Sequence, residues 1–397
     1  MDLDAFEWLL SDEGQARLAQ ATTATVAGES ELQVQSILRR TTTAERAAAV
    51  LTQVELRERA ADKLGELASR LYFTRDALEQ ATRLRVATHR AGRMRAFGTK
   101  TMIDLGCGIG GDLIAAARAG IICAGVDAEP LRVAIAQANL DALGLPGAVK
   151  VADATTVDHT PFDIAFADPA RRTGAGRTFK VDDWTPPWSW VEGLLSRDSC
   201  VKVAPGIPHS LIPDGVEAEW VSDGGEVKEA ALWSGRTATA DRRATVIEPA
   251  GGLITLTDED DPGADAVGVR DVAAYLYEPD GAVIRAGLVT AVAAGVQGGL
   301  IDPRIAYVTS DRALVTPLAR GYRVIEPLPY REKQLRAALR ARGIGRLTIK
   351  KRGVDVSPEQ LRKRLDLGGD GEATIVLTRV ADEGTCLLVE PIGAAGA

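Results

Sequence analysis

The residues best placed to do chemistry lie in a glycine-rich segment between two carboxylates, Asp104 and Asp112. An apolar run, Thr101–Ile103, precedes this segment, and a run of helical composition, Leu113–Ala119, follows it. The glycines of the segment include Gly106, Gly108 and Gly110. Glycine adopts positive φ without strain and lets the backbone approach a ligand closely. Strand, glycine turn and helix in this order are typical of the first unit of a nucleotide-binding α/β sheet.

The carboxylates beside the turn indicate which ligand it binds. The dinucleotide fingerprint has the spacing G-x-G-x-x-G and faces a pyrophosphate, whereas this turn has the spacing G-x-G-x-G-G-D. Asp104 and Asp112 would repel a pyrophosphate but attract a cationic ligand. S-adenosylmethionine carries a sulfonium, an α-amino group and ribose hydroxyls, and it has no phosphate. We therefore predict it as the cofactor, held by Asp104, Gly106, Gly108, Gly110 and Asp112.

Three further strand-like runs also end in aspartate. Ile121–Val126 is followed by Asp127, Val149–Ala152 by Asp153, and Phe162–Ala167 by Asp168. Open α/β sheets bind ligands at the carboxyl ends of their strands, so Asp127 is expected to accept from ribose hydroxyls and Asp153 to meet the adenine edge. A single aspartate is often only a helix cap or turn residue, but four in this order favour a binding edge. The pattern resembles the class I S-adenosylmethionine-dependent methyltransferases.

The segment Asp168–Arg172 is the predicted acceptor side of the site. Amino-group methyltransferases have D/N/S-P-P and an aromatic residue here, which orient the target nitrogen and stack on the base. Asp168 and Pro169 match this pattern, but Ala170 and Arg171 depart from it. We predict in-line displacement, in which Asp168 orients or deprotonates the nitrogen while Arg171 and Arg172 hold a substrate phosphate or carboxylate. The alternative is that both arginines are structural ion-pair partners.

Composition limits the class of protein. The 397 residues allow two to four domains, and no apolar run approaches the ~20 residues that span a bilayer. The start, Met1–Asp4, lacks the basic region of a signal peptide, so we expect a cytoplasmic protein without a membrane partner. The four cysteines are scattered and contain no C-x-x-C, which favours neither a metal site nor disulfides. The net charge of −8 argues against indiscriminate nucleic-acid binding by the whole surface.

Periodicity predicts the organisation of the chain. Residues 1–95 are expected to be helical, and 96–258 to form a Rossmann-like methyltransferase sheet. An acidic linker, Asp258–Gly263, precedes small α+β modules expected over 264–318 and 319–397. The predicted fold class is therefore α/β with an N-terminal helical region. One predicted helix is rich in basic residues and is either a solvated face or a positive wall beside the site. Its basic residues are Arg83, Arg85, His89, Arg90, Arg93 and Arg95.

The segment between Arg320 and Arg364 is strongly basic in an acidic protein. Its basic residues are opposed within the segment by Glu326, Glu332, Asp355 and Glu359. This concentration is the pattern expected for contact with a phosphate backbone, and we predict RNA as the partner. Lys350, Lys351 and Arg352, beside Gly353, are the predicted RNA contacts. The alternative is a solvated helix surface that is merely basic.

Three segments together resemble one bacterial family. They are Asp168–Arg172, Leu276–Gly287 and Ile349–Gly353. The family comprises methyltransferases with a ferredoxin-like domain and a C-terminal THUMP-like domain, distantly related to trimethylguanosine synthases. The resemblance assigns 264–318 to the former and 319–397 to the latter. It implies an RNA substrate, tRNA or rRNA, with a base nitrogen favoured. A protein or small acidic acceptor, or a non-catalytic RNA-binding or assembly role, remain as alternatives.

Overall fold

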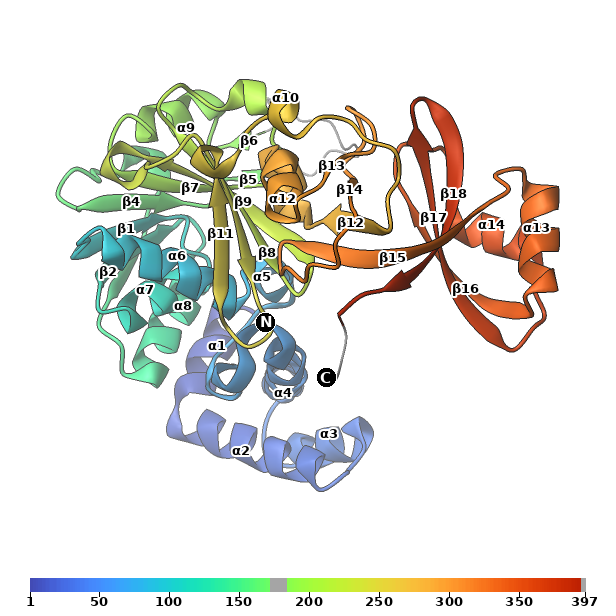
Figure 1. Ribbon diagram of the computed structural model, residues 1–397. Helices are drawn as coiled ribbons and strands as arrows, with labels where there is room; N and C mark the ends of the chain where they lie inside the picture. The colour runs from blue at the N-terminus through green and yellow to red at the C-terminus, as the bar shows by residue number, and fades with distance from the viewer. Residues whose placement is uncertain (172–183, 394–397) are drawn as a thin grey trace. The chain divides into compact units, whose positions relative to one another are not determined.

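The computed structural model describes residues 1–171 and 184–393 (Figure 1). The chain divides into two compact units. The first comprises Met1–Glu217 and Ala230–Thr239, and the second comprises Ala218–Glu229 and Ala240–Ala397. Each unit is described by itself below.

The first unit begins with six α-helices. They are α1 (Leu3–Leu10), α2 (Asp12–Val26), α3 (Glu31–Arg39), α4 (Ala44–Leu64), α5 (Arg75–Gln80) and α6 (Leu84–Ala96). Side chains of Asp2, Ser11, Thr43 and Thr74 accept hydrogen bonds from the backbone of the first turns of α1, α2, α4 and α5, which fixes where these helices start. Phe6, Leu9, Leu38 and Leu56 are fully buried in the core beneath them. The predicted helical character of the N-terminal region is confirmed.

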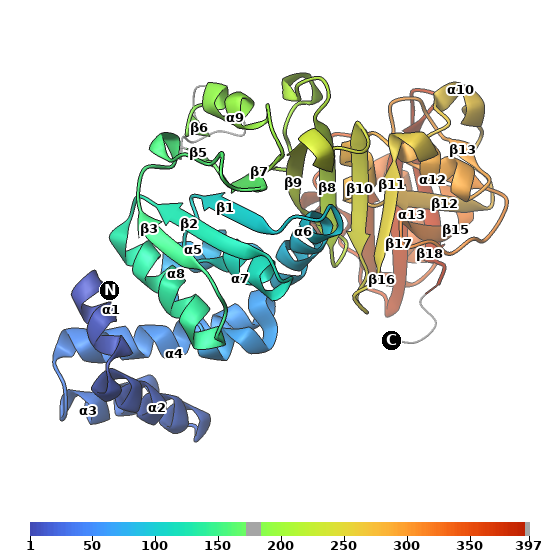
Figure 2. The same cartoon turned by 90° about the vertical axis from the view of Figure 1, so that its left-hand side faces the viewer.

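A parallel sheet follows the helices, and Figure 2 shows its strands side by side. The strands are β1 (Thr101–Leu105), β2 (Ile122–Asp127), β3 (Ala148–Val151), β4 (Ile164–Ala167) and β7 (Ser199–Val203), in the order β3-β2-β1-β4-β7. Helices α7 (Gly111–Arg118), α8 (Pro130–Leu143) and α9 (Trp188–Leu194) connect them. Strand β4 is buried along its whole length, as expected for parallel strands covered on both faces. The order reverses between β1 and β4, where a Rossmann-like sheet binds its ligand, and the predicted fold class is confirmed.

Two antiparallel additions complete this unit. Residues Ala230–Ser234 of β9 (Glu226–Ser234) pair with β7. A two-stranded ribbon forms from β5 (Ala170–Arg171) and β6 (Trp184–Thr185), with Arg171 opposite Trp184. Two residues, Asp168 and Pro169, separate β4 from the ribbon, so β5 lies within the predicted acceptor motif.

The second unit contains the remaining strands. β8 (Glu217–Asp223), β10 (Arg242–Ile247) and β11 (Leu253–Thr257) lie in the order β11-β10-β8. A seven-stranded sheet follows, in the order β13-β14-β12-β15-β18-β17-β16. Its strands are β12 (Tyr275–Pro279), β13 (Gly299–Leu300), β14 (Val308–Ser310), β15 (Ala319–Leu328), β16 (Ile344–Lys351), β17 (Gly371–Val380) and β18 (Glu383–Pro391). The predicted boundary between 318 and 319 thus falls between strands of one sheet, because β15 pairs with β12.

Five α-helices belong to the second unit. They are α10 (Ala264–Val267), α11 (Gly281–Ala286), α12 (Val289–Gly295), α13 (Glu332–Ala341) and α14 (Pro358–Leu365). Helices α13 and α14 contact each other and β16. Leu335 and Leu339 of α13 pack with Leu361 and Leu365 of α14 in one apolar cluster, so the charged residues of both helices face outwards.

Candidate active site

The glycine turn between β1 and α7 has the backbone that its sequence requires. Gly106, Gly108 and Gly110 have φ of 115°, 55° and 85°. The amides of Gly106 and Cys107 both donate to the carbonyl of Val126, at 2.9 Å, which ties the turn to β2. A Cβ on Gly106 or Gly108 would meet no atom within 4 Å, whereas one on Gly110 would lie 3.3 Å from the Cβ of Ala136. The first two glycines therefore border open space, and Gly110 lies close to α8.

A pocket lies over this turn at the carboxyl edge of the sheet. The turn, Asp104, Asp112 and Asp168 line it together with Gln80 at the end of α5 and Ala81 and Thr82 after it. Phe166 of β4 and Arg132 of α8 complete the polar and aromatic lining. The structure thus brings together three of the predicted aspartates with Gly106 and Gly108, as the parallel topology requires.

Asp104 has a buried carboxyl group whose charge is not fully balanced by nearby cations. Its side chain is 1% exposed, and its Oδ1 has no hydrogen-bond partner among the described residues. Burial raises its pKa well above 3.8, the charges of Asp112 and Asp168 raise it further, and Arg90 opposes them. Buried carboxylate oxygens are nearly always hydrogen-bonded, so an orphan oxygen beside a pocket fits a ligand that donates hydrogen bonds or carries positive charge. The predicted cofactor has both properties.

Asp112 and Asp168 are each held by a cation that the sequence did not assign to them. Asp112, in the first turn of α7, forms an ion pair with Arg90, whose guanidinium lies 4.8 Å from the ring centre of Phe166. Asp168, directly after β4, lies 2.5 Å from the Nζ of Lys202, and that Nζ also lies 3.1 Å from the Oγ1 of Thr82. The sequence offered one signal for Lys202, a lysine inside the apolar strand run Ser199–Val203.

Arg90 corrects the interpretation of the basic helix α6. Its exposed fraction is only 2%, so it is neither on a solvated face nor on an open positive wall. Arg93 is also largely shielded from solvent. Its Nη2 lies 2.6 Å from a carboxylate oxygen of buried Glu217, and its guanidinium lies 4.4 Å from the ring centre of Trp233. Arg90 pairs with the partly buried Asp112 and Arg93 with the buried Glu217, and helical spacing cannot reveal partners that come from elsewhere in the chain.

Asp127 lies at the end of β2 and supports the turn. Its Oδ2 accepts from the amide of Gly108 and its Oδ1 from the amide of Glu129, both at 3.0 Å. A carboxylate has about four acceptor sites, so both oxygens keep capacity for a hydroxyl donor. Asp153 differs, because it is exposed and accepts from the amide and hydroxyl of Thr155, at 2.9 and 2.7 Å. These bonds lower its pKa and account for a turn residue. Its contact with adenine stays a prediction.

The remaining predicted acceptor residues are only partly described. Pro169 is buried, and Arg171 belongs to β5 through its backbone. Arg172 lies outside the described residues. The substrate roles of Arg171 and Arg172 stay predictions. Among the described residues, no cluster of three or more metal-ligating side chains occurs, and no helix is long and apolar enough to cross a bilayer.

The basic C-terminal segment is more strongly paired than its sequence suggested. Lys350 Nζ lies 3.2 Å and Arg352 Nη2 4.0 Å from the carboxylate of Glu278 on β12, whereas Lys351 is exposed. Several other arginines pair with carboxylates on neighbouring elements. These pairs include Arg340–Asp366, Arg342–Glu326, Arg346–Glu372 and Arg364–Glu332. Counting only the acidic residues within the segment therefore underestimates how many of its cations are paired, because several partners come from outside it.

A glycine turn, a buried orphan carboxylate and a reversal of strand order match the predicted Rossmann-like methyltransferase fold, and the comparisons with known proteins agree. Two curated proteins from two strains of Mycobacterium tuberculosis, each called an uncharacterized S-adenosylmethionine-dependent methyltransferase, are 39% identical to the chain over 340 residues. The match covers 82% of this chain and 90% of theirs. The chain therefore belongs to this family, and it is an enzyme whose cofactor is S-adenosylmethionine.

Family models and a solved structure add detail. A model described as THUMP domain-like matches residues 319–391, and one described as a domain of unknown function (DUF8688) matches residues 2–60. A crystal structure from Porphyromonas gingivalis, provisionally named a methyltransferase, has a TM-score of 0.74 at 23% identity and covers 94% of this chain and 98% of its own. This likeness shows that the whole architecture recurs in a distant sequence.

Proposed function

We propose that this methyltransferase acts on RNA, with a base nitrogen of tRNA or rRNA as the acceptor. The observation that carries the proposal is a set of unpaired cations on α13, directly before α13 and on α14, inside the THUMP-like segment. They are Arg331, Lys333, Arg336, Arg362 and Lys363. Within the described ranges none of these five side chains forms an ion pair, whereas Arg340 and Arg364 on the same helices do. Together these five define the helix cation surface.

The geometry of this surface suits a phosphate backbone. Lys333 and Arg336 are three residues apart on α13, so they lie on one face of that helix. Arg362 and Lys363 come from α14, which contacts α13. Leu335 and Leu365 anchor the two helices in the core, so the cations are displayed from a rigid support. Cations without internal partners are the ones available to displace counterions from RNA.

For the cofactor, we propose that Asp104, Gly106, Gly108, Gly110, Asp112, Asp127 and Asp153 form its site. S-adenosylmethionine, when bound, supplies an electrophilic methyl group. The orphan oxygen of Asp104 would accept from its cationic end, and the carboxylate of Asp127 from its ribose hydroxyls. Gly106 and Gly108 would let the backbone approach it closely. Lys202 and Arg90 would keep the remaining carboxylates of the cleft in place.

For the acceptor, we propose that Asp168 orients the target nitrogen by accepting one of its hydrogens. Lys202 fixes the position of this carboxylate through the contact between its Nζ and Oδ2. Pro169 directs the chain out of the sheet into the ribbon that contains Arg171. Arg171 and Arg172 are proposed to hold a substrate phosphate. Alignment of the nitrogen and exclusion of water would then provide most of the acceleration.

The test uses labelled S-adenosylmethionine with total RNA from a strain that lacks the protein, followed by nucleoside mass spectrometry. The expected result is one modified nucleoside that is absent from the untreated RNA. RNA affinity of the full chain should also fall steeply as salt rises. Label that enters protein or small acids but no RNA would contradict the proposal and favour the alternative acceptor class.

A further inference from the structure

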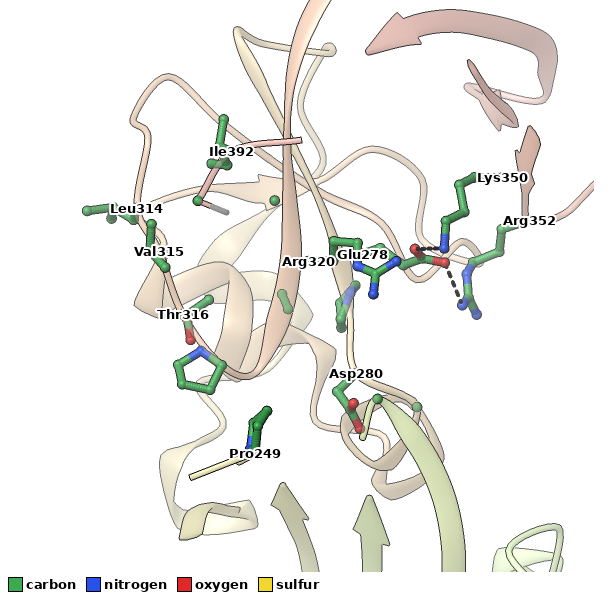
Figure 3. A pocket seen from close by; sticks show the side chains of 17 residues that line it. Pro249, Glu278, Asp280, Leu314, Val315, Thr316, Arg320, Lys350, Arg352 and Ile392 are labelled. Atoms are coloured by element: carbon green, nitrogen blue, oxygen red, sulfur yellow. Dashed lines mark ion pairs between the residues drawn. The ribbon is translucent and has the colours of Figure 1, made fainter. Parts of the chain in front are cut away.

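The second unit contains a cavity of about 640 Å³ that the proposed methyl transfer does not use. Figure 3 shows it between β12, β15 and the end of β16. Its volume falls in the range of about 300–1,000 Å³ that is typical of small-molecule sites. Every residue that lines it belongs to the second unit, so the site is complete within that unit.

Both carboxylates at the cavity already have interaction partners within the protein. Glu278 pairs with Lys350 and Arg352 and accepts from the hydroxyl of Tyr322 at 3.5 Å. Asp280 accepts from the amide of Ala282 at 2.8 Å and from the hydroxyl of Ser222 at 3.0 Å. These two side chains position their neighbours, and neither is left to attract a cation.

The cations at the cavity exceed what these carboxylates can satisfy. Arg320 of β15 is a third cation beside Lys350 and Arg352, and it lies against the hydroxyl of Tyr322. The Nε of Arg352 is buried and has no hydrogen-bond partner among the described residues. A buried guanidinium N–H without an acceptor is unusual and favours an anionic ligand that supplies one. Guanidinium groups match phosphate especially well.

The opposite side of the cavity is apolar. Leu314, Val315 and Ile392 lie together there, away from Glu278 and Lys350 (Figure 3). A ligand that contacts both sides would therefore join an anionic group such as a phosphate to a less polar body. A nucleotide has this composition and fits the volume.

We propose that this cavity binds a nucleoside monophosphate, with its phosphate at Arg320, Lys350 and Arg352 and its base against Leu314, Val315 and Ile392. The nucleotide could be free or could be the phosphorylated end of an RNA chain, because the recognised chemistry is the same. The site goes beyond the proposed function and does not depend on it, since a free nucleotide can bind whether or not RNA is methylated.

The test is isothermal titration of the full chain with AMP, GMP, CMP and UMP, with the corresponding nucleosides as phosphate-free probes. We expect at least one monophosphate to bind and its nucleoside to bind at least tenfold more weakly, because charge-assisted hydrogen bonds to the phosphate would be lost. Lys350→Ala and Arg320→Ala should each weaken binding about tenfold or more. Arg323→Ala is the matched control, because Arg323 is an exposed cation on the same strand as Arg320, pairs with Glu390 and does not line the cavity. It should bind like the unaltered chain.

Two further measurements separate loss of the site from misfolding and identify the source of the nucleotide. Thermal unfolding and S-adenosylmethionine binding of each variant should match those of the unaltered chain, so that loss of nucleotide binding cannot come from misfolding. Competition by a short oligonucleotide with a 5′-phosphate, but not by its unphosphorylated form, would identify an RNA end as the source. Competition by neither form would identify the free nucleotide. Absence of binding by all four monophosphates and the phosphorylated oligonucleotide, or equal losses for Arg320→Ala and Arg323→Ala, would overturn the proposal.

Discussion

The proposed cofactor cleft and the THUMP-like segment are both rich in charged side chains, but the two regions differ in how these side chains are paired and exposed. In the cleft, Asp104, Asp112 and Asp168 line one pocket. Asp104 is 1% exposed, and burial and the neighbouring carboxylates raise its pKa. In the THUMP-like segment, pairs such as Arg346–Glu372 have side chains that are 73% and 69% exposed. The cleft brings three carboxylates together around one buried group and pairs two of them with cations, whereas the THUMP-like segment pairs opposite charges at the solvent-exposed surface.

This difference indicates where a substitution should matter. An exposed ion pair is worth roughly 0–1 kcal/mol, because water and salt screen it. A buried carboxylate without a partner destabilises the folded chain unless a ligand uses it. Charge in the cleft is therefore expected to serve chemistry, whereas most charge in the THUMP-like segment is neutral in effect, except where cations remain unpaired.

The largest expected effect is at Asp168. Asp168→Ala should lower methyl transfer by about 10²–10⁴-fold, the usual contribution of a positioned acid–base group, while cofactor binding persists. The measurement is turnover with labelled cofactor and RNA from the deletion strain, with cofactor affinity measured on the same sample. Asp158→Ala is a suitable control, because Asp158 is an exposed turn residue bonded to Thr160. Turnover that survives in a folded Asp168→Ala variant would remove Asp168 from the mechanism.

The second-largest expected effect is a loss of cofactor affinity on substitution of Asp127. Asp127→Ala removes the acceptor for the Gly108 and Glu129 amides and the proposed ribose contact, so cofactor affinity should fall about 10–100-fold. Calorimetric titration with S-adenosylmethionine measures this loss. Asp153→Ala should have a smaller effect, because Asp153 is exposed and bonded to Thr155. Equal losses of cofactor affinity in both variants would show that the hydrogen bonds that Asp127 accepts from the backbone do not matter for cofactor binding.

The helix cation surface should give an intermediate effect. Lys333→Ala with Arg336→Ala should weaken RNA binding roughly uniformly across sequences and reduce the slope of log affinity against log salt by about 1.4, at ~0.7 per single-strand phosphate contact. Arg346→Ala is the matched control, since Arg346 pairs with Glu372. An unchanged slope in the double variant would place the RNA elsewhere.

Asp104 should give the smallest effect, on stability. A carboxyl whose folded pKa is raised stabilises the fold fully below its unfolded pKa and loses this contribution as pH rises through the folded pKa. Without cofactor, Asp104→Asn should therefore raise the melting temperature by a few degrees, about 2–4 °C for each kcal/mol, at neutral pH and less near pH 4. Thermal scans across this range measure the difference. A gain that does not depend on pH would mean that folding does not raise the pKa of Asp104.

The sequence by itself determined the class of fold and the cofactor, and it predicts which residues form the donor half of the site. Asp104, the glycines and Asp127 follow from the local order of strand, turn and helix, and parallel strands must bring their carboxyl ends to one edge. The class of fold and the cofactor could therefore be predicted from residues near one another in the chain.

Only the tertiary structure decided which charges meet. Lys202 reaches Asp168 because β7 lies beside β4, and Arg90 reaches Asp112 because α6 packs on α7. Glu278 reaches Lys350 and Arg352 from β12, so two of the three predicted RNA contacts are partly neutralised and line a cavity. The physical reason is that Coulomb energy depends on distance and solvent, and the spacing of residues along the chain fixes neither.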